Sequence, residues 1–177
     1  MTARSTTHPD EVRVIVAQVV DPELPVLTIE DLGILRDVSV ADDGHITVTI
    51  TPTYSGCPAV EAITDDVRNV LAAEGFAEVS VRTVLAPAWT TDWMSDAGRA
   101  KLLAYGIAPP APLEPSEGPH RGSAGNRSTV VTVALSQLCP RCGSPDTREL
   151  SRFGSTACKS LWMCTVCKEP FDHFKAI

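Results

Sequence analysis

The sequence lacks the features that would place the chain in a membrane or in a secretory route. It contains no run of about 18 or more apolar residues, the length that a transmembrane helix needs. Its first 11 residues are polar and have no apolar centre, so they do not resemble a signal peptide. Six cysteines without an export signal are typical of a reducing compartment, where they bind metals or stay free thiols. We therefore expect a cytoplasmic protein without a membrane partner.

A strongly basic surface is also missing. Residues 1–108 hold 16 acidic against 7 basic side chains, and residues 128–177 hold 4 acidic against 6 basic ones. Tight binding to nucleic acid requires a basic face that neutralises phosphates. Neither part offers one, so no nucleic-acid partner is expected.

Recognisable catalytic motifs are absent as well. The sequence shows no glycine-rich loop that could cradle a phosphate and no nucleophile–histidine–aspartate set. Its histidines are scattered, and none has a partner at metal-ligand spacing: His8, His45, His120 and His173. The sequence therefore predicts no catalytic residue.

The most informative feature is a set of two Cys-x-x-Cys pairs near the C-terminal end. Cys139 and Cys142 form the first pair, and Cys164 and Cys167 follow after 21 residues. Four thiolates are the ligand set of a tetrahedral Zn²⁺ or iron ion, whereas redox dithiols or disulfides are the alternative. Because about fifty residues cannot build a stable core alone, we expect a small β-rich zinc ribbon over residues 128–177 with a structural metal.

Cys57 lies in the segment Thr51-Pro-Thr-Tyr-Ser-Gly-Cys57-Pro58, between a predicted strand and a predicted helix. Pro58 fits the first helical position, which places Cys57 at or beside the helix N-terminus. Free N–H groups and the helix dipole there favour a thiolate, hence a metal ligand or nucleophile, although three acidic residues of the same helix oppose it. An inert buried cysteine is the alternative.

The segment Asp21-Pro22-Glu23-Leu24-Pro25 presents two carboxylates on a stiff turn after the first predicted helix. If the fold brings Asp21 and Glu23 close to Cys57, they can tune its thiol or bind iron as hard ligands. Otherwise the segment is only a rigid turn that ends the helix.

Cys158 lies between the two cysteine pairs and is not needed for a four-thiolate site. It is either a small buried hydrophobe or an accessible thiol whose pKa the neighbouring Lys159 lowers and which can bind or pass on a metal. Trp89 and Trp93, four residues apart, leave a similar choice between packing against the sheet and forming a partner or cofactor surface.

The N-terminal part has the pattern of an α/β (α+β) fold. Apolar residues at helical spacing predict helices near residues 9–20, 58–74 and 95–105, and alternation predicts strands over 34–40, 45–51 and 79–85. Thr7 with Asp10 resembles a capping box for the first helix, and Ser95 is the expected cap of the last. The order αββαβα predicts a small mixed sheet with helices on one face.

Residues 109–127 carry five prolines and almost no large apolar side chain. Such a segment cannot bury a core, so we predict a linker there between an α/β domain over residues 1–108 and the ribbon. A β-rich run from Thr129 to Leu135 leads into the first cysteine pair.

Several motifs carry a resemblance to known families. Asp21-Pro22-Glu23, then Ile29-Glu-Asp31-Leu-Gly33-Ile34 and Thr53-Tyr-Ser-Gly-Cys57-Pro58, resemble the iron–sulfur cluster assembly family that is defined by an Asp-Pro-Glu motif. In that family the domain is a compact α/β unit linked to cluster assembly or delivery. Its hallmark cysteine matches Cys57, and its acidic turn matches Asp21 and Glu23.

Later motifs are similar to the D subunits of bacterial phenylacetyl-CoA epoxidase (ring-1,2-monooxygenase) systems. They are Pro87-Ala-Trp89-Thr-Thr-Asp92-Trp93, Tyr105-Gly-Ile-Ala-Pro-Pro110, Phe153-Gly-Ser-Thr-Ala-Cys158-Lys159 and the segment Cys164 to Lys175. The resemblance implies an accessory maturation factor in phenylacetate degradation, with oxygenase or reductase subunits as partners. Cys57, Asp21 and Glu23 would hold a transient iron ion or iron–sulfur cluster.

Two other functions remain open on the sequence alone. The chain lacks the paired Glu-x-x-His helices of a di-iron oxygenase, so it is not expected to catalyse the oxygenation. It can instead be a non-catalytic structural subunit of the oxygenase complex, or a rubredoxin-like electron carrier with iron at the four cysteines. A cluster bridged by Cys57 would need a second thiol, so a homodimer is also expected.

Overall fold

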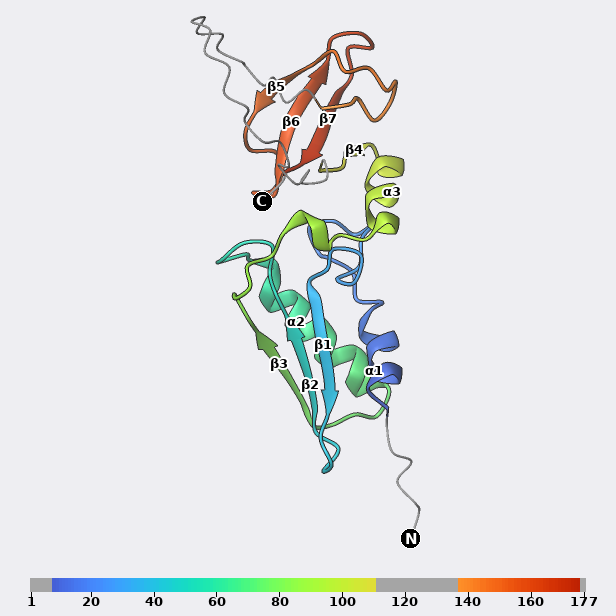
Figure 1. The fold of residues 1–177 in the computed structure, drawn as a ribbon, viewed down its shortest axis with the longest axis vertical. Helices are drawn as coiled ribbons and strands as arrows, with labels where there is room; N and C mark the ends of the chain where they lie inside the picture. The colour runs from blue at the N-terminus through green and yellow to red at the C-terminus, as the bar shows by residue number, and fades with distance from the viewer. Residues whose placement is uncertain (1–7, 111–136, 176–177) are drawn as a thin grey trace, which may run out of the picture.

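The computed structural model describes residues 8–110 and 137–175. We call residues 8–108 the N-terminal domain and residues 137–175 the ribbon. The order of the N-terminal elements confirms the predicted αββαβα pattern (Figure 1). These elements are α1 (Pro9–Val16), β1 (Leu35–Val40), β2 (Ile46–Ile50), α2 (Ala59–Ala73), β3 (Val79–Thr83), the 3-10 turn Thr91–Trp93, α3 (Asp96–Tyr105) and β4 (Ile107–Ala108). The ribbon contains β5 (Thr147–Ser151), β6 (Lys159–Cys164) and β7 (Pro170–Phe174).

A three-stranded sheet with the order β1-β2-β3 forms the centre of the N-terminal domain. β1 and β2 are the predicted antiparallel hairpin, and β3 pairs parallel with β2. Two parallel neighbours require a crossover, which α2 provides along one face of the sheet (Figure 1). α1 packs against both β1 and α2. The alternating apolar residues of the hairpin are therefore buried: Val38, Ile46, Val48 and Ile50.

The first two helices begin close to the predicted positions. α1 is capped by His8, whose side chain accepts from the backbone N–H of Asp10; Thr7, the predicted cap, lies outside the described residues. α2 starts after Pro58, and its buried stripe is Ala59, Ile63, Val67 and Leu71.

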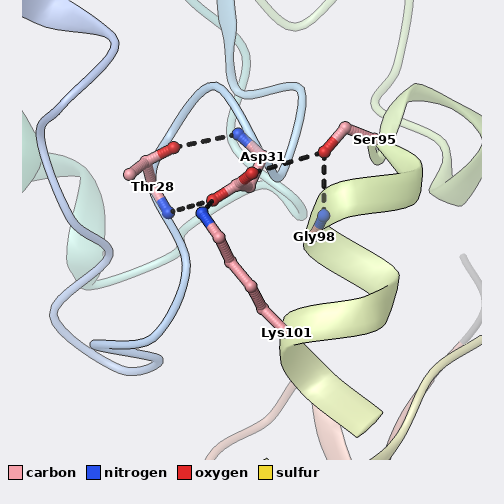
Figure 2. A network of polar contacts seen from close by, with 5 residues as sticks. All are labelled: Thr28, Asp31, Ser95, Gly98 and Lys101. Atoms are coloured by element: carbon pink, nitrogen blue, oxygen red, sulfur yellow. Dashed lines mark hydrogen bonds and ion pairs between the residues drawn. The ribbon is translucent and has the colours of Figure 1, made fainter. Parts of the chain in front are cut away.

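A polar network centred on Asp31 ties α3 to the long loop between α1 and β1 (Figure 2). Asp31 exchanges hydrogen bonds with Thr28 and forms an ion pair with Lys101. Ser95 bridges the two segments, because its hydroxyl contacts Asp31 and accepts from the N–H of Gly98 as the predicted cap of α3. Burial acts to raise the pKa of Asp31, but the hydrogen bonds from Lys101 and Thr28 outweigh it and lower that pKa. This network fixes the loop that carries Asp21 and Glu23.

The ribbon has its own sheet, with the order β4-β7-β6-β5. β5, β6 and β7 are antiparallel neighbours, whereas β4 comes from the end of the N-terminal domain and pairs parallel with β7. Backbone hydrogen bonds thus join the ribbon to the N-terminal domain. The predicted strand over 129–135 and all but the first two residues of the predicted linker over 109–127 lie outside the described residues.

Side chains also join the two parts. Phe174 and Cys158 of the ribbon are 1% and 3% exposed and belong to the same apolar core as the helices and sheet of the N-terminal domain. The ring of Phe174 meets that of Trp89 edge to face, with centroids 6.1 Å apart. Trp89 is buried and donates its indole N–H to the carbonyl oxygen of Leu32 at 2.8 Å. Trp89 is therefore packed in the core, and its printed contacts are with the ribbon and with the loop before β1.

Trp93 is only half-buried and packs against the same loop. The guanidinium of Arg36 lies 3.5 Å from the centre of its ring, a cation–π contact. Gly33 has a positive φ of 68°, and a Cβ there would lie 2.4 Å from the backbone oxygen of Trp93. Only glycine fits this close approach.

Candidate functional site

The four paired cysteines form a preorganised metal site in the ribbon. Their sulfur atoms all lie within 4.8 Å of one another. The Sγ atoms of Cys139 and Cys167 are 3.7 Å apart, and those of Cys142 and Cys164 are 3.6 Å apart. Tetrahedral Zn²⁺ with bonds of about 2.3 Å to sulfur requires separations of about 3.8 Å. The donor set and its dimensions therefore fit zinc.

The backbone of the two cysteine turns supports this arrangement. Gly143 adopts a positive φ of 72° and donates its N–H to the carbonyl oxygen of Cys139, which closes the first turn. In the second turn the N–H of Cys167 points at the sulfur of Cys164, and it lowers the pKa of that thiol to about 6. Four protein ligands would leave no open coordination position on a bound ion, which is the arrangement of structural zinc sites.

Cys57 lies in the tight loop between β2 and α2. Its N–H donates to the carbonyl oxygen of Tyr54 at 3.3 Å, and Gly56 supplies the positive φ that the loop needs. The side chain is half-buried, one residue before the cap of α2. This is the predicted place at the helix N-terminus.

The predicted ease of thiolate formation at Cys57 is not what the structure shows. Burial raises the pKa of this thiol, the N–H of Ala59 at the start of α2 acts against it, and the charges of Glu23 and Asp21 raise it further. The helix N-terminus therefore does contribute, but desolvation and two carboxylates from another loop outweigh it. A bound cation would act in the opposite direction and favour the thiolate form of Cys57.

Asp21 and Glu23 lie close enough to Cys57 for their charges to act on it. The two carboxylates do different things. Asp21 is buried, and one of its oxygens accepts the N–H groups of Glu23 and Leu24 at 2.8 Å each, which folds the loop around it. Burial raises the pKa of Asp21, and these hydrogen bonds act in the opposite direction. Glu23 is half-buried, and it makes no such loop contact with its side chain among the described residues.

Cys158 reaches the same place from the ribbon, 135 residues along the chain from Glu23. Its thiol donates to a carboxylate oxygen of Glu23 at 3.7 Å and also contacts the hydroxyl of Thr156 at 3.0 Å. Burial raises the pKa of Cys158, and the charge of Lys159 lowers it by less. Of the two alternatives for Cys158, the structure shows the buried one. The surroundings of the Cys158 thiol are nevertheless polar as well as apolar.

Tyr54 belongs to the same surroundings. Burial, followed by the charge of Cys57 and a hydrogen bond with it, raises the pKa of Tyr54 to about 12, and the charges of Glu23 and Cys158 add to the effect. Sequence reasoning did not single out Tyr54 or assign Cys158 to this site. Tyr54 stands three residues before Cys57, whereas nothing in the sequence places Cys158 there.

Cys57 also borders an open pocket on the outer side of the loop. The pocket has a volume of about 540 Å³ and is lined mainly by the start of α2 and the end of β3, including Pro58, Val60, Glu61 and Leu85. Leu85 is 58% exposed. A partner or a bound group therefore has access to the cysteine from solvent.

Two family models match separate parts of the chain. The model of the family described as iron–sulfur cluster assembly protein matches residues 9–83, and the model of the PaaD zinc beta ribbon domain matches residues 124–175. A crystal structure of a domain of unknown function, DUF59, from Bacillus anthracis superposes with a TM-score of 0.50 at 30% identity. It covers 53% of this chain and 90% of that one.

Two curated relatives show how far the similarity extends. An Fe-S protein maturation auxiliary factor from Porphyromonas gingivalis is 39% identical over 54% of this chain and 90% of its own length. The Escherichia coli (strain K12) protein that is named as the D subunit of a "Putative 1,2-phenylacetyl-CoA epoxidase" is 44% identical over 94% of this chain and 92% of its own length. The chain therefore belongs to the same family as that epoxidase protein, and it joins an iron–sulfur cluster assembly domain to a PaaD zinc ribbon.

Proposed function

We propose that this protein is an accessory maturation factor of a phenylacetyl-CoA epoxidase system, and that it takes up iron or an iron–sulfur cluster as cargo at Cys57. The cargo passes to an oxygenase or reductase subunit of that system. The observation that carries the proposal is the environment of Cys57, which is a half-buried thiol beside Glu23 and Asp21 and at the edge of an open pocket.

The chemistry of the site suits a transient ligand better than a permanent one. A thiol with a raised pKa binds a metal only by releasing a proton, so the bound state competes with protonation. One thiolate with one or two carboxylates is also an incomplete ligand set for iron, which leaves positions for the thiols of a client. The four-cysteine site offers a complete set of four sulfur ligands instead, and it keeps a structural role.

The relatives support the same assignment. Three curated relatives of the N-terminal domain carry the name Fe-S protein maturation auxiliary factor, and the relative along the whole chain carries the name of an epoxidase subunit. A maturation domain joined to a ribbon in a subunit of an oxygenase system is consistent with delivery to that system. In the described residues no helix is both long enough and apolar enough to cross a bilayer.

Anaerobic reconstitution tests the proposal. Protein whose ribbon has been filled with zinc is incubated with Fe²⁺ and sulfide, and the visible absorbance of bound iron–sulfur is measured. Cys57→Ser should lose this absorbance, whereas the control Ser55→Ala, an exposed residue of the same loop, should keep it. Unchanged spectra in Cys57→Ser would overturn the cargo role.

Growth on phenylacetate separates the proposal from a purely structural subunit. Cys57→Ala should abolish growth if cargo must be carried. Normal growth of Cys57→Ala together with failure of Trp93→Ala would favour the structural role, in which only the packed surface matters.

A further inference from the structure

Cys158 is a cysteine of the ribbon that does not belong to the four-cysteine group. The four ligands of that site are complete without it. Its side chain is 3% exposed and packs into the core of the N-terminal domain, whereas the small core of the ribbon consists of other residues. The ribbon therefore places this sulfur in the neighbouring domain.

The groups around Cys158 are those of a metal site. Its thiol donates to a carboxylate oxygen of Glu23 at 3.7 Å, and the charge of the same carboxylate acts on Cys57. Cys57 also packs against the apolar core to which Cys158 belongs. The three side chains come from three separate parts of the chain. A mixed set of thiolate and carboxylate ligands suits a divalent ion such as Fe²⁺, Zn²⁺ or Co²⁺.

The thiol of Cys158 donates to Glu23 at 3.7 Å, and among the described residues only the four ribbon cysteines already lie within 4.8 Å of one another. Glu23 and Asp21 place negative charge beside both Cys57 and Cys158. A divalent cation would offset these charges and draw the ligands together.

We propose that Cys158 is a ligand of the cargo ion together with Cys57 and Glu23, so that the site is composite and is closed only when the ribbon is docked. This inference rests on the proposed function, which needs Cys57 alone. On uptake, Cys57 and Cys158 each release one proton to solvent and form one bond to the divalent metal. No electron is transferred. On delivery, two client thiolates replace them, and two protons return to the protein.

Asp21 and Lys159 complete the surroundings without being ligands. Asp21 already uses one carboxylate oxygen to hold the turn on which Glu23 stands. The ammonium of Lys159 is buried and lies 3.4 Å from a carboxylate oxygen of Asp172 in β7. Because Lys159 follows Cys158 directly, this ion pair holds the ribbon loop that carries Cys158 against β7.

Titration with Co²⁺ tests the composite site. Zinc-filled, anaerobic full-length protein is titrated with Co²⁺, and the thiolate-to-cobalt charge-transfer absorbance is measured per bound ion, with zinc content measured afterwards to show that the ribbon kept its ion. Cys158→Ala should lower the absorbance per ion to about half, since one of two sulfur ligands is lost. Glu23→Gln should keep both sulfurs but weaken binding by about tenfold or more.

Thr156→Val is the matched control, because it removes the hydroxyl beside the Cys158 sulfur but no ligand. It should keep the absorbance of the unchanged protein. Thermal unfolding of each variant checks that the ribbon is still docked, and Glu23→Gln covers the case in which Cys158→Ala does not fold.

The outcomes separate this inference from the proposed function. Loss of cobalt binding in Cys57→Ser with no change in Cys158→Ala would overturn the composite site and leave the cargo role of Cys57 standing. No change in either variant, or no second ion in the unchanged protein, would overturn both. A fall in Thr156→Val as large as in Cys158→Ala would also overturn the composite site, since it would show a general disturbance.

Discussion

In the N-terminal domain, two helices close over a three-stranded sheet and bury a continuous apolar core, whereas the ribbon contributes only three buried apolar residues to the second core cluster among those described: Cys139, Cys164 and Phe171. Two of these three are cysteines of the four-cysteine group. We therefore expect hydrophobic burial to stabilise the first region and metal coordination to stabilise the second. The ribbon uses other apolar side chains, those of Phe174 and Cys158, to dock onto its neighbour.

This difference shows how one chain can hold two cysteine sites with different properties. The four ribbon sulfurs are already at metal-site distances, so we expect their ion to be part of the fold. Cys158 reaches Glu23 through docking of the ribbon, and Cys57 lies near the carboxylates of the loop after α1. A site of the second kind is suited to exchange, because its ligands come from separate segments and are not yet gathered around an ion.

Removal of the ribbon metal should have the largest effect on stability. If the ribbon stayed folded without its metal, the contrast between the two regions would be wrong. Structural zinc contributes about 10–16 kcal/mol of apparent binding free energy in small domains. A strong chelator, or Cys164→Ser, should unfold β5–β7 and leave the sheet of the N-terminal domain folded. Hydrogen exchange along the full-length chain measures this difference directly.

Cys158→Ala is the control for this experiment, because it removes a cysteine of the ribbon but none of the four zinc ligands. It should retain one zinc ion per chain and the protection of β6 and β7. Protection of β5–β7 that survives complete chelation would show that the ribbon, too, is held by its apolar core.

Phe174→Ala tests the docking between the two regions. The Phe174 ring is 1% exposed and packs against Trp89, so its removal should cost about 3–5 kcal/mol. Urea unfolding followed by tryptophan fluorescence measures the loss. The matched control is Phe153→Ala, since Phe153 is 69% exposed and its replacement should cost less than about 0.5 kcal/mol. Equal effects of the two substitutions would contradict the shared core.

Much of the fold could be predicted because its signals are local. The hairpin follows from alternation around Gly44, and the start of α3 follows from Ser95, which caps it as expected. The four-cysteine site follows from spacing alone. Each of these depends on residues that are near one another in the sequence or on a fixed ligand geometry.

The rest depends on contacts between distant segments. Nothing local indicates that the short strand β4 pairs with β7, or that Cys158 contacts Glu23, because both require the docking of the ribbon. The direction of the pKa shift at Cys57 was also mispredicted. The helix N-terminus is visible in the sequence, but the desolvation and the Asp21 and Glu23 charges that outweigh it come from the tertiary fold.

A smaller effect, dependent on pH, sharpens the comparison on the ribbon side. His173 of β7 is 7% exposed, its Nδ1 lies 3.2 Å from the hydroxyl of Ser160, and its Nε2 has no hydrogen-bond partner among the described residues. Burial, with the charge of Lys175, lowers the pKa of His173 to about 4 from an ordinary value of 6.5. The folded protein therefore keeps this ring neutral, and protonation favours the unfolded chain.

The sign of the effect follows from this shift. Below pH 6.5 the unfolded chain binds a proton that the folded chain does not, so stability is full above that pH and falls as the pH drops towards 4. At pH 5.5 the loss from this residue should be about 1.4 kcal/mol relative to pH 8. Urea unfolding at a series of pH values measures it, and His173→Gln, which cannot titrate, should lose this part of the slope. Zinc content at each pH separates the effect from protonation of the metal ligands. A slope that is the same in both proteins while zinc stays bound would show that His173 is not buried neutral, and that the ribbon is less tightly packed on β4 than the structure shows.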